Sequence, residues 1–355
     1  MKHNPSGLVK SVGLFVAAIT LCAAQTSKAG VGGFVDAQAI SGTNATANAT
    51  AQNSVGFAVA DGAVYLSKEL GKGKVLLDLP FAYTNGSAAG TLGFAAAAKA
   101  QAFVNFGYDF GLDWTLGRFD SPFVSVESND SVNLAYAFQS GLYAALPHIH
   151  QGLMLNYAIQ GFSVKALVSN NAGTATRADA GNAYAENYEY GVLAKYAHDM
   201  FWVGAGFYLH KPAAGTETGT LIDISAGTKV SDLAIDLEAV MTKVPVSGAD
   251  SGFAVAANFW YTINKTWGVG IRPEYNSKLT NVYAVGTGAN YSQFQVTAGP
   301  SCNLTEDLKV RLNYVFASTK GNTTASTATV PSATWTDAGT STSSHAGVLS
   351  AVYKF

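Results

Sequence analysis

The last nine residues, Gly347-Val348-Leu349-Ser350-Ala351-Val352-Tyr353-Lys354-Phe355, alternate in character. Because successive side chains of a β-strand point to opposite faces, Leu349, Ala351, Tyr353 and Phe355 share one face of such a strand. An apolar face that ends in an aromatic ring suits the last strand of a membrane β-barrel, whose outside meets lipid and whose inside meets water. We therefore expect Tyr353 and Phe355 to form a C-terminal barrel-assembly signal.

The amino-terminal segment has the layout of an export signal. Lys2, His3 and Lys10 precede an apolar run over 12–24, and small residues follow that run. The alternative interpretation is an uncleaved membrane anchor.

Two cleavage sites fit the small residues of this segment. One lies after Ala24 and the other after Ala29, and the second would leave Gly30 to open a strand-like segment. We therefore expect a signal peptide over 1–29 and an outer-membrane β-barrel over 30–355.

The composition fits a barrel better than a soluble protein. Charged residues and aromatic residues each make up 12% of the chain, an unusual balance for a soluble surface. Beyond the export segment, no apolar run approaches the ~20 residues that a spanning helix needs. Loss of the three lysines of the signal changes the net charge from −2 to −5, which gives nucleic-acid binding no electrostatic support. Cys22 leaves with the signal, so Cys302 stands alone and predicts no disulfide.

Short alternating segments recur after the signal, and connections of two kinds join them. The tight connections are Gly71-Lys72, Gly111, Gln160-Gly161, Asp199-Met200, Ser231-Asp232, Asn264-Lys265 and Thr305-Glu306-Asp307. The longer ones, rich in Ser, Thr, Gly, Ala and Asn, span roughly 41–52, 85–92, 120–147, 170–186, 212–219, 245–251, 277–289 and 319–344. Seven tight and eight long connections alternate, which predicts an all-β, antiparallel up-and-down barrel of about sixteen strands with both termini on the side of the tight turns. Fourteen strands is the alternative.

The apolar and polar faces of these segments differ in a way that suits a membrane. Aromatic residues of the apolar face cluster near the segment ends: Tyr83, Phe110, Tyr157, Phe201, Tyr261, Tyr275, Phe316 and Tyr353. Such clusters match the aromatic girdles at the two membrane interfaces. The alternative is a large soluble all-β protein.

The polar face would line a lumen with mixed charges. Its acids are Asp36, Asp78, Asp109, Glu189, Asp223, Asp236, Glu238 and Glu274, and its bases are Lys99, Lys165, Lys195, Lys229, Arg272, Lys309, Arg311 and Lys354. Sixteen strands leave a water-filled channel. Equal numbers of acids and bases predict passage of small hydrated solutes without a strong charge filter, although each residue taken alone could simply be a solvated or paired charge.

The third long connection, 120–147, is too apolar to extend freely into water. After Asp120, Glu127 and Asp130 it runs without charge, and Leu134, Phe138, Leu142 and Leu146 recur every four residues, which predicts a short amphipathic helix. We expect the loop to fold inward and narrow the channel, with its acids facing wall bases across a constriction. The alternative is a loop packed over the barrel mouth or against a neighbouring subunit. The pore-lining or constriction candidates are Arg118, Asp120, Glu127, Asp130, Lys165, Arg272, Glu274, Lys309 and Arg311.

Catalytic patterns are weak in this sequence. His148 and His150 stand at alternate positions and, with Glu127 or Asp130, could hold a metal or serve a barrel hydrolase. No Gly-rich phosphate loop, nucleophile elbow or cysteine pair is present. We therefore expect no catalytic site, no cofactor, no metal and no enzyme activity.

Two segments resemble a known family. Gly33-Phe34-Val35-Asp36-Ala37 and Leu116-Gly117-Arg118-Phe119-Asp120-Ser121-Pro122-Phe123 are similar to the opening segment and to the strand end before the long loop in Gram-negative porins of the β-barrel porin-2 (OmpL-like) family. The resemblance implies a diffusion porin of the outer membrane. The Ala/Thr-rich external loops depart from the family pattern, and the constriction charges cannot be mapped from it.

These observations predict a passive outer-membrane channel for small hydrophilic solutes and ions. The expected partners are outer-membrane lipids and lipopolysaccharide, the barrel-assembly machinery and the solutes themselves, with no nucleic acid. A homotrimer suits a sixteen-stranded channel, although the sequence shows no interface. The alternative function is that of a closed structural or adhesive surface protein, which the long Thr/Asn loops favour.

Overall fold

The computed structural model describes residues 29–45, 52–80, 82–84, 91–93, 100–123, 136–137, 142, 146–170, 188–210, 217–244, 251–278, 290–322 and 342–355. In this part of the chain the regular secondary structure consists of strands. No helix among these residues is long and apolar enough to cross a membrane.

The described residues form eighteen strands. They are β1 (Ala29–Ala45), β2 (Gln52–Leu70), β3 (Gly73–Pro80), β4 (Ala82–Thr84), β5 (Thr91–Gly93), β6 (Gln101–Gly107), β7 (Leu112–Asp120), β8 (Ile149–Ile159), β9 (Phe162–Asn170), β10 (Tyr188–Ala197), β11 (Phe201–His210), β12 (Gly219–Val230), β13 (Leu233–Lys243), β14 (Gly252–Thr262), β15 (Trp267–Ser277), β16 (Asn290–Asn303), β17 (Leu308–Asn322) and β18 (Thr342–Lys354).

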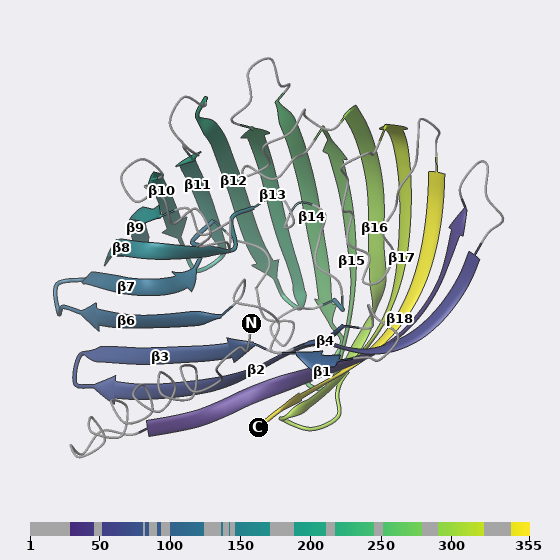
Figure 1. Cartoon of the computed structure of the whole chain (residues 1–355), viewed down its shortest axis with the longest axis horizontal. Coiled ribbons are helices and arrows are strands. Elements are labelled where there is room, and N and C mark those ends of the chain that lie inside the picture. Colours follow the sequence, from purple (N-terminus) through teal and green to yellow (C-terminus); the bar gives the residue numbers. More distant parts are fainter. Residues whose placement is uncertain are drawn as a thin grey trace, which may run out of the picture.

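Sixteen of these strands form one closed antiparallel barrel. Each pairs with its neighbour in the chain, except that β4 and β5 leave the wall as a separate two-stranded sheet, so that β3 pairs with β6. Figure 1 shows the strands following one another around a single curved wall. The predicted strand number and up-and-down topology are confirmed.

The barrel closes where the first and last strands meet. β1 pairs with β18 from Phe34↔Lys354 to Ala45↔Ser343. At the rim, the Gly33 amide donates to the Phe355 carbonyl at 3.0 Å, and the Phe355 amide donates to the Gly33 carbonyl at 3.1 Å. This closure puts the start of β1 and the end of β18 on the side of the tight turns, as predicted.

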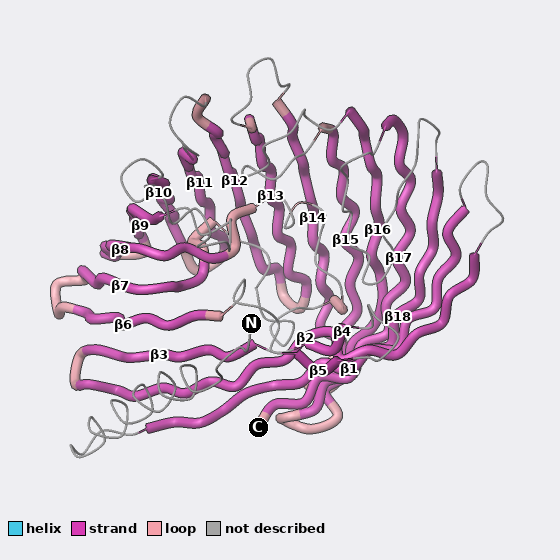
Figure 2. Tube along the Cα trace, in the orientation of Figure 1, coloured by secondary structure: helices cyan, strands magenta, loops and turns pink. Residues whose placement is uncertain are grey.

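The tight turns lie at the positions that the sequence indicated, and Figure 2 shows several of them along one rim of the wall. At Gln160-Gly161 both residues have positive φ, 47° and 81°. Such a two-residue turn matches the right-handed twist of the strands that it joins, which explains the short connection.

The two faces of the wall alternate as expected. In β17, Leu312 is 55% exposed on the outside, whereas Arg311 is fully buried on the inside. Tyr157, Phe201, Tyr261 and other predicted girdle residues are exposed on the outer face.

Asp109 is a correction to the predicted lumen wall. β6 ends at Gly107, so Asp109 lies in the turn before β7, where it is exposed and pairs with Lys72. The alternation of strand faces that would put Asp109 on the lumen side together with Asn105 therefore ends before Asp109. Lys99, another predicted lumen residue, lies outside the described residues.

The lipid-facing outer wall predicts that a charge placed on it lowers the stability of the barrel. Leu312→Arg places a cation near the middle of the lipid-facing wall and should lower the free energy of unfolding by about 2–4 kcal/mol. Urea unfolding from lipid vesicles measures this change. Leu312→Phe is the control and should cost far less, and equal stability of the two variants would contradict the assignment of this face to lipid.

Candidate channel constriction

The third loop begins in a socket on the inner wall. Phe123 follows β7 and is fully buried. Its ring lies against Gly191 and Gly206, where an added Cβ would come within 2.6 and 2.9 Å of ring atoms. Tyr208 meets the ring edge-on, with centroids 5.5 Å apart. The two glycines therefore make room for an aromatic ring inside the barrel.

A hydrophobic cluster extends this contact along the wall. Leu142 and Leu146 of the loop are buried with Phe123 against the inner side chains of six strands, β9 to β14. The wall side of the cluster consists of Leu167, Leu193, Tyr208, Leu221, Val240 and Ala254. Burial of two leucines and a phenylalanine contributes several kcal/mol, at about 1.5–3 kcal/mol for each side chain.

The loop then reaches the opposite side of the wall. Arg311 Nη1 on β17 donates to the Tyr136 carbonyl at 2.9 Å, and the Ala137 amide donates to Asn313 Oδ1 at 2.8 Å. Gln38 Nε2 on β1 donates to the Ala137 carbonyl at 3.3 Å. Because these contacts are far around the barrel from Phe123, the loop crosses the lumen.

The Tyr136 ring is held in a second pocket of the wall. It meets Trp260 edge-on at 5.9 Å, and the Arg272 guanidinium lies 5.0 Å from its centroid. Its hydroxyl donates to the Phe259 carbonyl at 3.3 Å, beside Gly270. The ring therefore fixes the loop against β14 and β15.

The inward fold of the loop is thus confirmed, but the expected helix is wrong. The described residues Tyr136, Ala137, Leu142 and Leu146 are bends and turns. Leu134 and Phe138 lie outside the described residues. Wall side chains bind the backbone groups of Tyr136 and Ala137 that a helix would use for its own hydrogen bonds, and this replaces helical pairing.

Arg311 is the centre of a buried charged network. Its Nη2 donates to Asp36 Oδ2 at 2.7 Å, and both side chains are fully buried. Ser350 on the intervening strand donates to Asp36 Oδ1 at 2.7 Å, and Gln38 donates to Asp36 Oδ2 at 3.0 Å. The guanidinium that was expected to face loop acids is therefore paired with a wall acid, and it contacts the loop through a carbonyl.

Arg272 and Glu274 form a second buried pair of opposite charges, on β15. Arg272 Nε lies 3.9 Å from Glu274 Oε1, and Gln295 Nε2 donates to the same oxygen at 2.6 Å. The structure thus brings Arg272, Glu274 and Arg311 to the part of the wall that receives Tyr136.

The other candidates lie elsewhere. Arg118 and Asp120 are on β7 near the start of the loop, and Gln101 Nε2 donates to Asp120 Oδ1 at 2.9 Å. Lys165 on β9 and Lys309 on β17 are half-buried inner-face residues close to the tight turns. Glu127 and Asp130 lie outside the described residues.

A histidine cluster at the root of the loop was not predicted. Glu189 lies between two imidazoles, with Oε2 3.1 Å from His150 Nδ1 and Oε1 3.3 Å from His210 Nδ1. Ser121 Oγ lies 3.1 Å from His150 Nε2, and Ser169 donates to Glu189 at 2.6 Å. These side chains are buried, so they join the loop root to β8, β9, β10 and β11.

His150 lies in this cluster without His148, the histidine two residues before it in the sequence. His148 precedes β8, and its carbonyl accepts a hydrogen bond from the Ser121 amide at 2.8 Å. The acid beside His150 is Glu189 on another strand. Among the described residues, no three or more His, Cys, Asp and Glu side chains form a group that could hold a metal ion.

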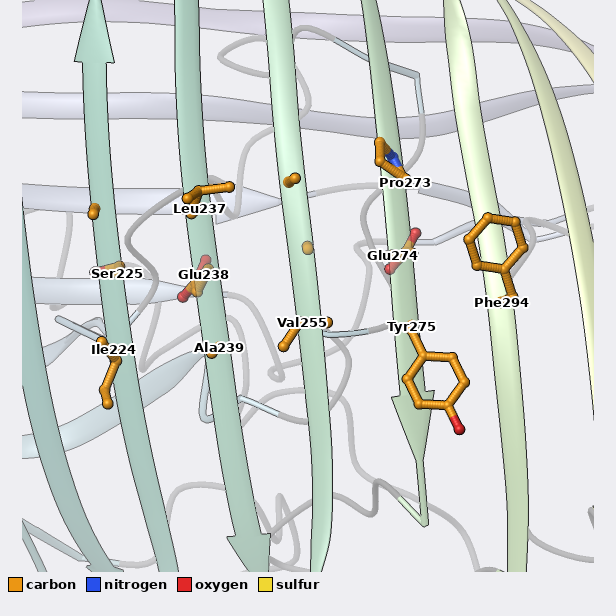
Figure 3. A pocket seen from close by; sticks show the side chains of 13 residues that line it. Ile224, Ser225, Leu237, Glu238, Ala239, Val255, Pro273, Glu274, Tyr275 and Phe294 are labelled. Carbon is orange, nitrogen blue, oxygen red and sulfur yellow. The ribbon is translucent and has the colours of Figure 1, made fainter.

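The outer wall also carries a shallow apolar groove of about 590 Å³ over β12 to β16. Leu237, Val255, Tyr275 and Phe294 line its lipid side (Figure 3). Because it opens to the outside of the barrel, this groove is not part of the solute path.

A closed sixteen-stranded barrel with an apolar outer face, a polar inner face and a loop across its lumen is an outer-membrane channel of the porin class. The chain belongs to the family described as "Putative beta-barrel porin-2, OmpL-like", whose model matches residues 28–355. It is thus a porin, a multi-pass barrel of the Gram-negative outer membrane. No curated protein is significantly similar to it in sequence.

Solved structures share this fold at low sequence identity. The anion-selective porin from Comamonas acidovorans is 15% identical with a TM-score of 0.67, over 93% of this chain and 100% of that one. The outer membrane channel DcaP of Acinetobacter baumannii is 13% identical with a TM-score of 0.63, over 93% of this chain and 97% of that one. Salmonella typhi OmpF, in complex with daunomycin, is 11% identical with a TM-score of 0.59, over 93% and 98%.

The contact between Gly191 and the Phe123 ring predicts that substitutions at these two positions have non-additive effects on the free energy of unfolding. Gly191→Ala should push the Phe123 ring out of place and lower the free energy of unfolding by about 1–3 kcal/mol. In a Phe123→Ala background the same change should cost little, because the clash is gone. Urea unfolding of the four proteins of this double-mutant cycle measures the coupling, and additive losses would contradict the socket.

Proposed function

We propose that solutes cross the part of the lumen that the third loop leaves open. The observation that carries this proposal is the attachment of the loop at two distant places, the Phe123 socket and the Tyr136 pocket. A loop held at these two places would narrow the channel at a fixed position. Small hydrophilic solutes and ions would then diffuse through in hydrated form, and larger ones would be excluded by size.

We also propose that the charge selectivity is weak. Arg311 and Asp36 form an ion pair, and Arg272 lies beside Glu274, so both bases that contact Tyr136 have an acid of the wall at their side. Paired charges of opposite sign largely cancel at the distance of a passing ion. Lys165 and Lys309, which lie nearer the tight-turn rim, would then tune the field that an ion meets there.

Planar-bilayer recording of the refolded protein tests both proposals. The wild-type protein should show discrete conductance steps and a small reversal potential in a KCl gradient. Lys165→Glu combined with Lys309→Glu should shift the reversal potential toward cation preference, because the rim becomes negative. Lys72→Glu, in the exposed tight turn between β2 and β3, is the control and should change little. A verified barrel without conductance would end the channel proposal, and an unchanged potential would exclude the lysines from selectivity.

We propose the following partners on the same basis. The exposed apolar outer face fits outer-membrane lipid and lipopolysaccharide, and Tyr353 with Phe355 fits recognition by the barrel-assembly machinery. Three copies would form a homotrimer. The fold is that of non-enzymatic channels, and we propose that the protein has no enzyme activity of its own.

We propose that the export signal is cleaved after Ala29. This site is supported by β1, which begins at this point of the chain: its pairing with β2 runs from Ala29↔Lys68 and Gly30↔Ser67 onward. Mass spectrometry of the protein purified from outer membranes should therefore give an amino terminus at Gly30. A mature chain that begins at Gln25 would place cleavage after Ala24 instead, and a retained segment 1–29 would show an uncleaved anchor.

A further inference from the structure

Two lysines of the inner wall lie together on neighbouring strands, Lys165 on β9 and Lys195 on β10. Lys165 lies opposite Leu193 in the strand register, and Lys195 is two residues further along β10 on the same face. Such diagonal positions are about 7–8 Å apart, within reach of long side chains. Both lysines are half-buried, and each ammonium group feels the charge of the other. The fold therefore concentrates positive charge at one place of the lumen wall.

On the β8 side, an amide separates Lys165 from the neighbouring acid. Asn156 lies opposite Lys165 in one register and opposite Asp113 of β7 in the other. Its Nδ2 donates to Asp113 Oδ2 at 2.7 Å, and Asn105 Nδ2 donates to Asp113 Oδ1 at 3.4 Å. The Asp113 carboxylate is thus bound by two amides, with Asn156 between it and Lys165.

On the β11 side, an indole separates Lys195 from Asp236. The Trp202 ring lies over Gly227, where an added Cβ would come within 2.2 Å of the indole Nε1 and 2.4 Å of Asp236 Oδ1. The indole N–H donates to the Asp236 carboxylate, and Asn258 Nδ2 donates to its Oδ2 at 3.4 Å. Lys195 Nζ lies over the indole ring, 3.9 Å from its centroid. Asp236 therefore attracts Lys195 from beyond the ring, while its oxygens accept hydrogen bonds from other donors.

The other acids of the described wall lie farther from the two lysines. In the row of Lys195 the next acid is Glu238, three strands away, with Gly204 and Ser225 between them. Among the described residues, neither Lys165 nor Lys195 has a carboxylate at ion-pair distance, in contrast to Lys72 and Lys243. The two ammonium groups therefore present their charge to the lumen.

The lysine pair lies at the foot of the seat of the third loop. Leu167 on β9 and Leu193 on β10 pack with Phe123 in the hydrophobic cluster that holds the loop. On each strand the lysine is two residues closer to the tight turn than the leucine. A solute that crosses the lumen beside the loop therefore meets the two ammonium groups on the tight-turn side of the constriction.

We propose that Lys165 and Lys195 form a binding site for a small oxyanion, the carboxylate or phosphate group of a solute. Each ammonium group has three N–H donors, and hydrogen bonds between a charged donor and a charged acceptor are the strong ones. An oxyanion between the lysines also relieves their mutual repulsion, and Ser163, opposite Lys195, offers a hydroxyl. The proposal rests on the proposed channel function and names a class of solute that the channel holds on its way.

Calorimetric titration of the full mature chain, refolded in detergent at constant ionic strength, tests the site. Sodium phosphate and sodium succinate are the two probes, and at least one should give a saturable heat with one site per chain. The probe with the lower Kd identifies the preferred group. Lys165→Gln and Lys195→Gln should each raise that Kd about tenfold, because each removes one charged donor. Lys229→Gln is the matched control, since Lys229 is an exposed lysine on the inner face of β12 near the same rim, and should leave the Kd unchanged.

Tryptophan fluorescence locates the bound anion. An oxyanion that draws the Lys195 ammonium group away from the Trp202 ring weakens a cation–π contact. The emission should therefore change in parallel with the heat of binding, and Trp202→Phe should remove this change while the saturable heat remains.

Two results would overturn the proposal. The first is a wild-type protein that gives no saturable heat with either probe. The second is a Kd that is the same in wild type and in the lysine variants, or that Lys229→Gln raises as much as they do, because binding would then follow general charge. Either lysine variant alone decides if the other does not refold. Bilayer conductance is recorded separately, so discrete conductance steps without oxyanion binding would remove this site and leave the channel function intact.

Discussion

The structure depends on one constraint, that no backbone amide or carbonyl is left unpaired in lipid. Each unpaired group in hydrocarbon costs several kcal/mol, so a spanning sheet is stable only when it has no edge. The ladder from β1 to β18 meets this need, and the two hydrogen bonds between Gly33 and Phe355 complete it at the rim. Closure then forces one face of every strand outward to lipid and the other inward. The separate inner face, which can be polar, thus follows from closing the barrel so that every backbone group has a hydrogen-bond partner.

The inner wall in turn decides the conformation of the third loop. The loop's own sequence has a four-residue apolar period that favours a helix, yet at the described positions it forms bends. Wall groups explain the difference: Gly191 and Gly206 leave space for the Phe123 ring, and Arg311 and Asn313 bind the backbone at Tyr136 and Ala137. Local periodicity is a weak preference, and a preformed wall with donors and sockets outweighs it.

The sequence predicts strand positions and faces well, because the period of two is local. It predicts contacts between strands only where a tight turn sets the register. Glu189↔His210 follows from the turn near Asp199, since residues at equal distances from a tight turn pair with each other. Ser169 reaches Glu189 across the long connection 171–187, and Arg311 reaches Asp36 over 275 residues of chain. Long connections do not set a register, so these parts of the site could not be predicted.

The positions of the charges on the lumen wall matter more for selectivity than their number, for a physical reason. Equal numbers of acids and bases suggested a balanced channel, but an ion responds to the local field rather than to the total. Arg311 and Arg272 lie beside acids at the constriction, so they add little to the field in the path. Asp223 and Glu238 are two acids of the inner wall whose carboxyl groups interact directly. The field along the lumen therefore depends on which charges are paired on the wall and not on their total number.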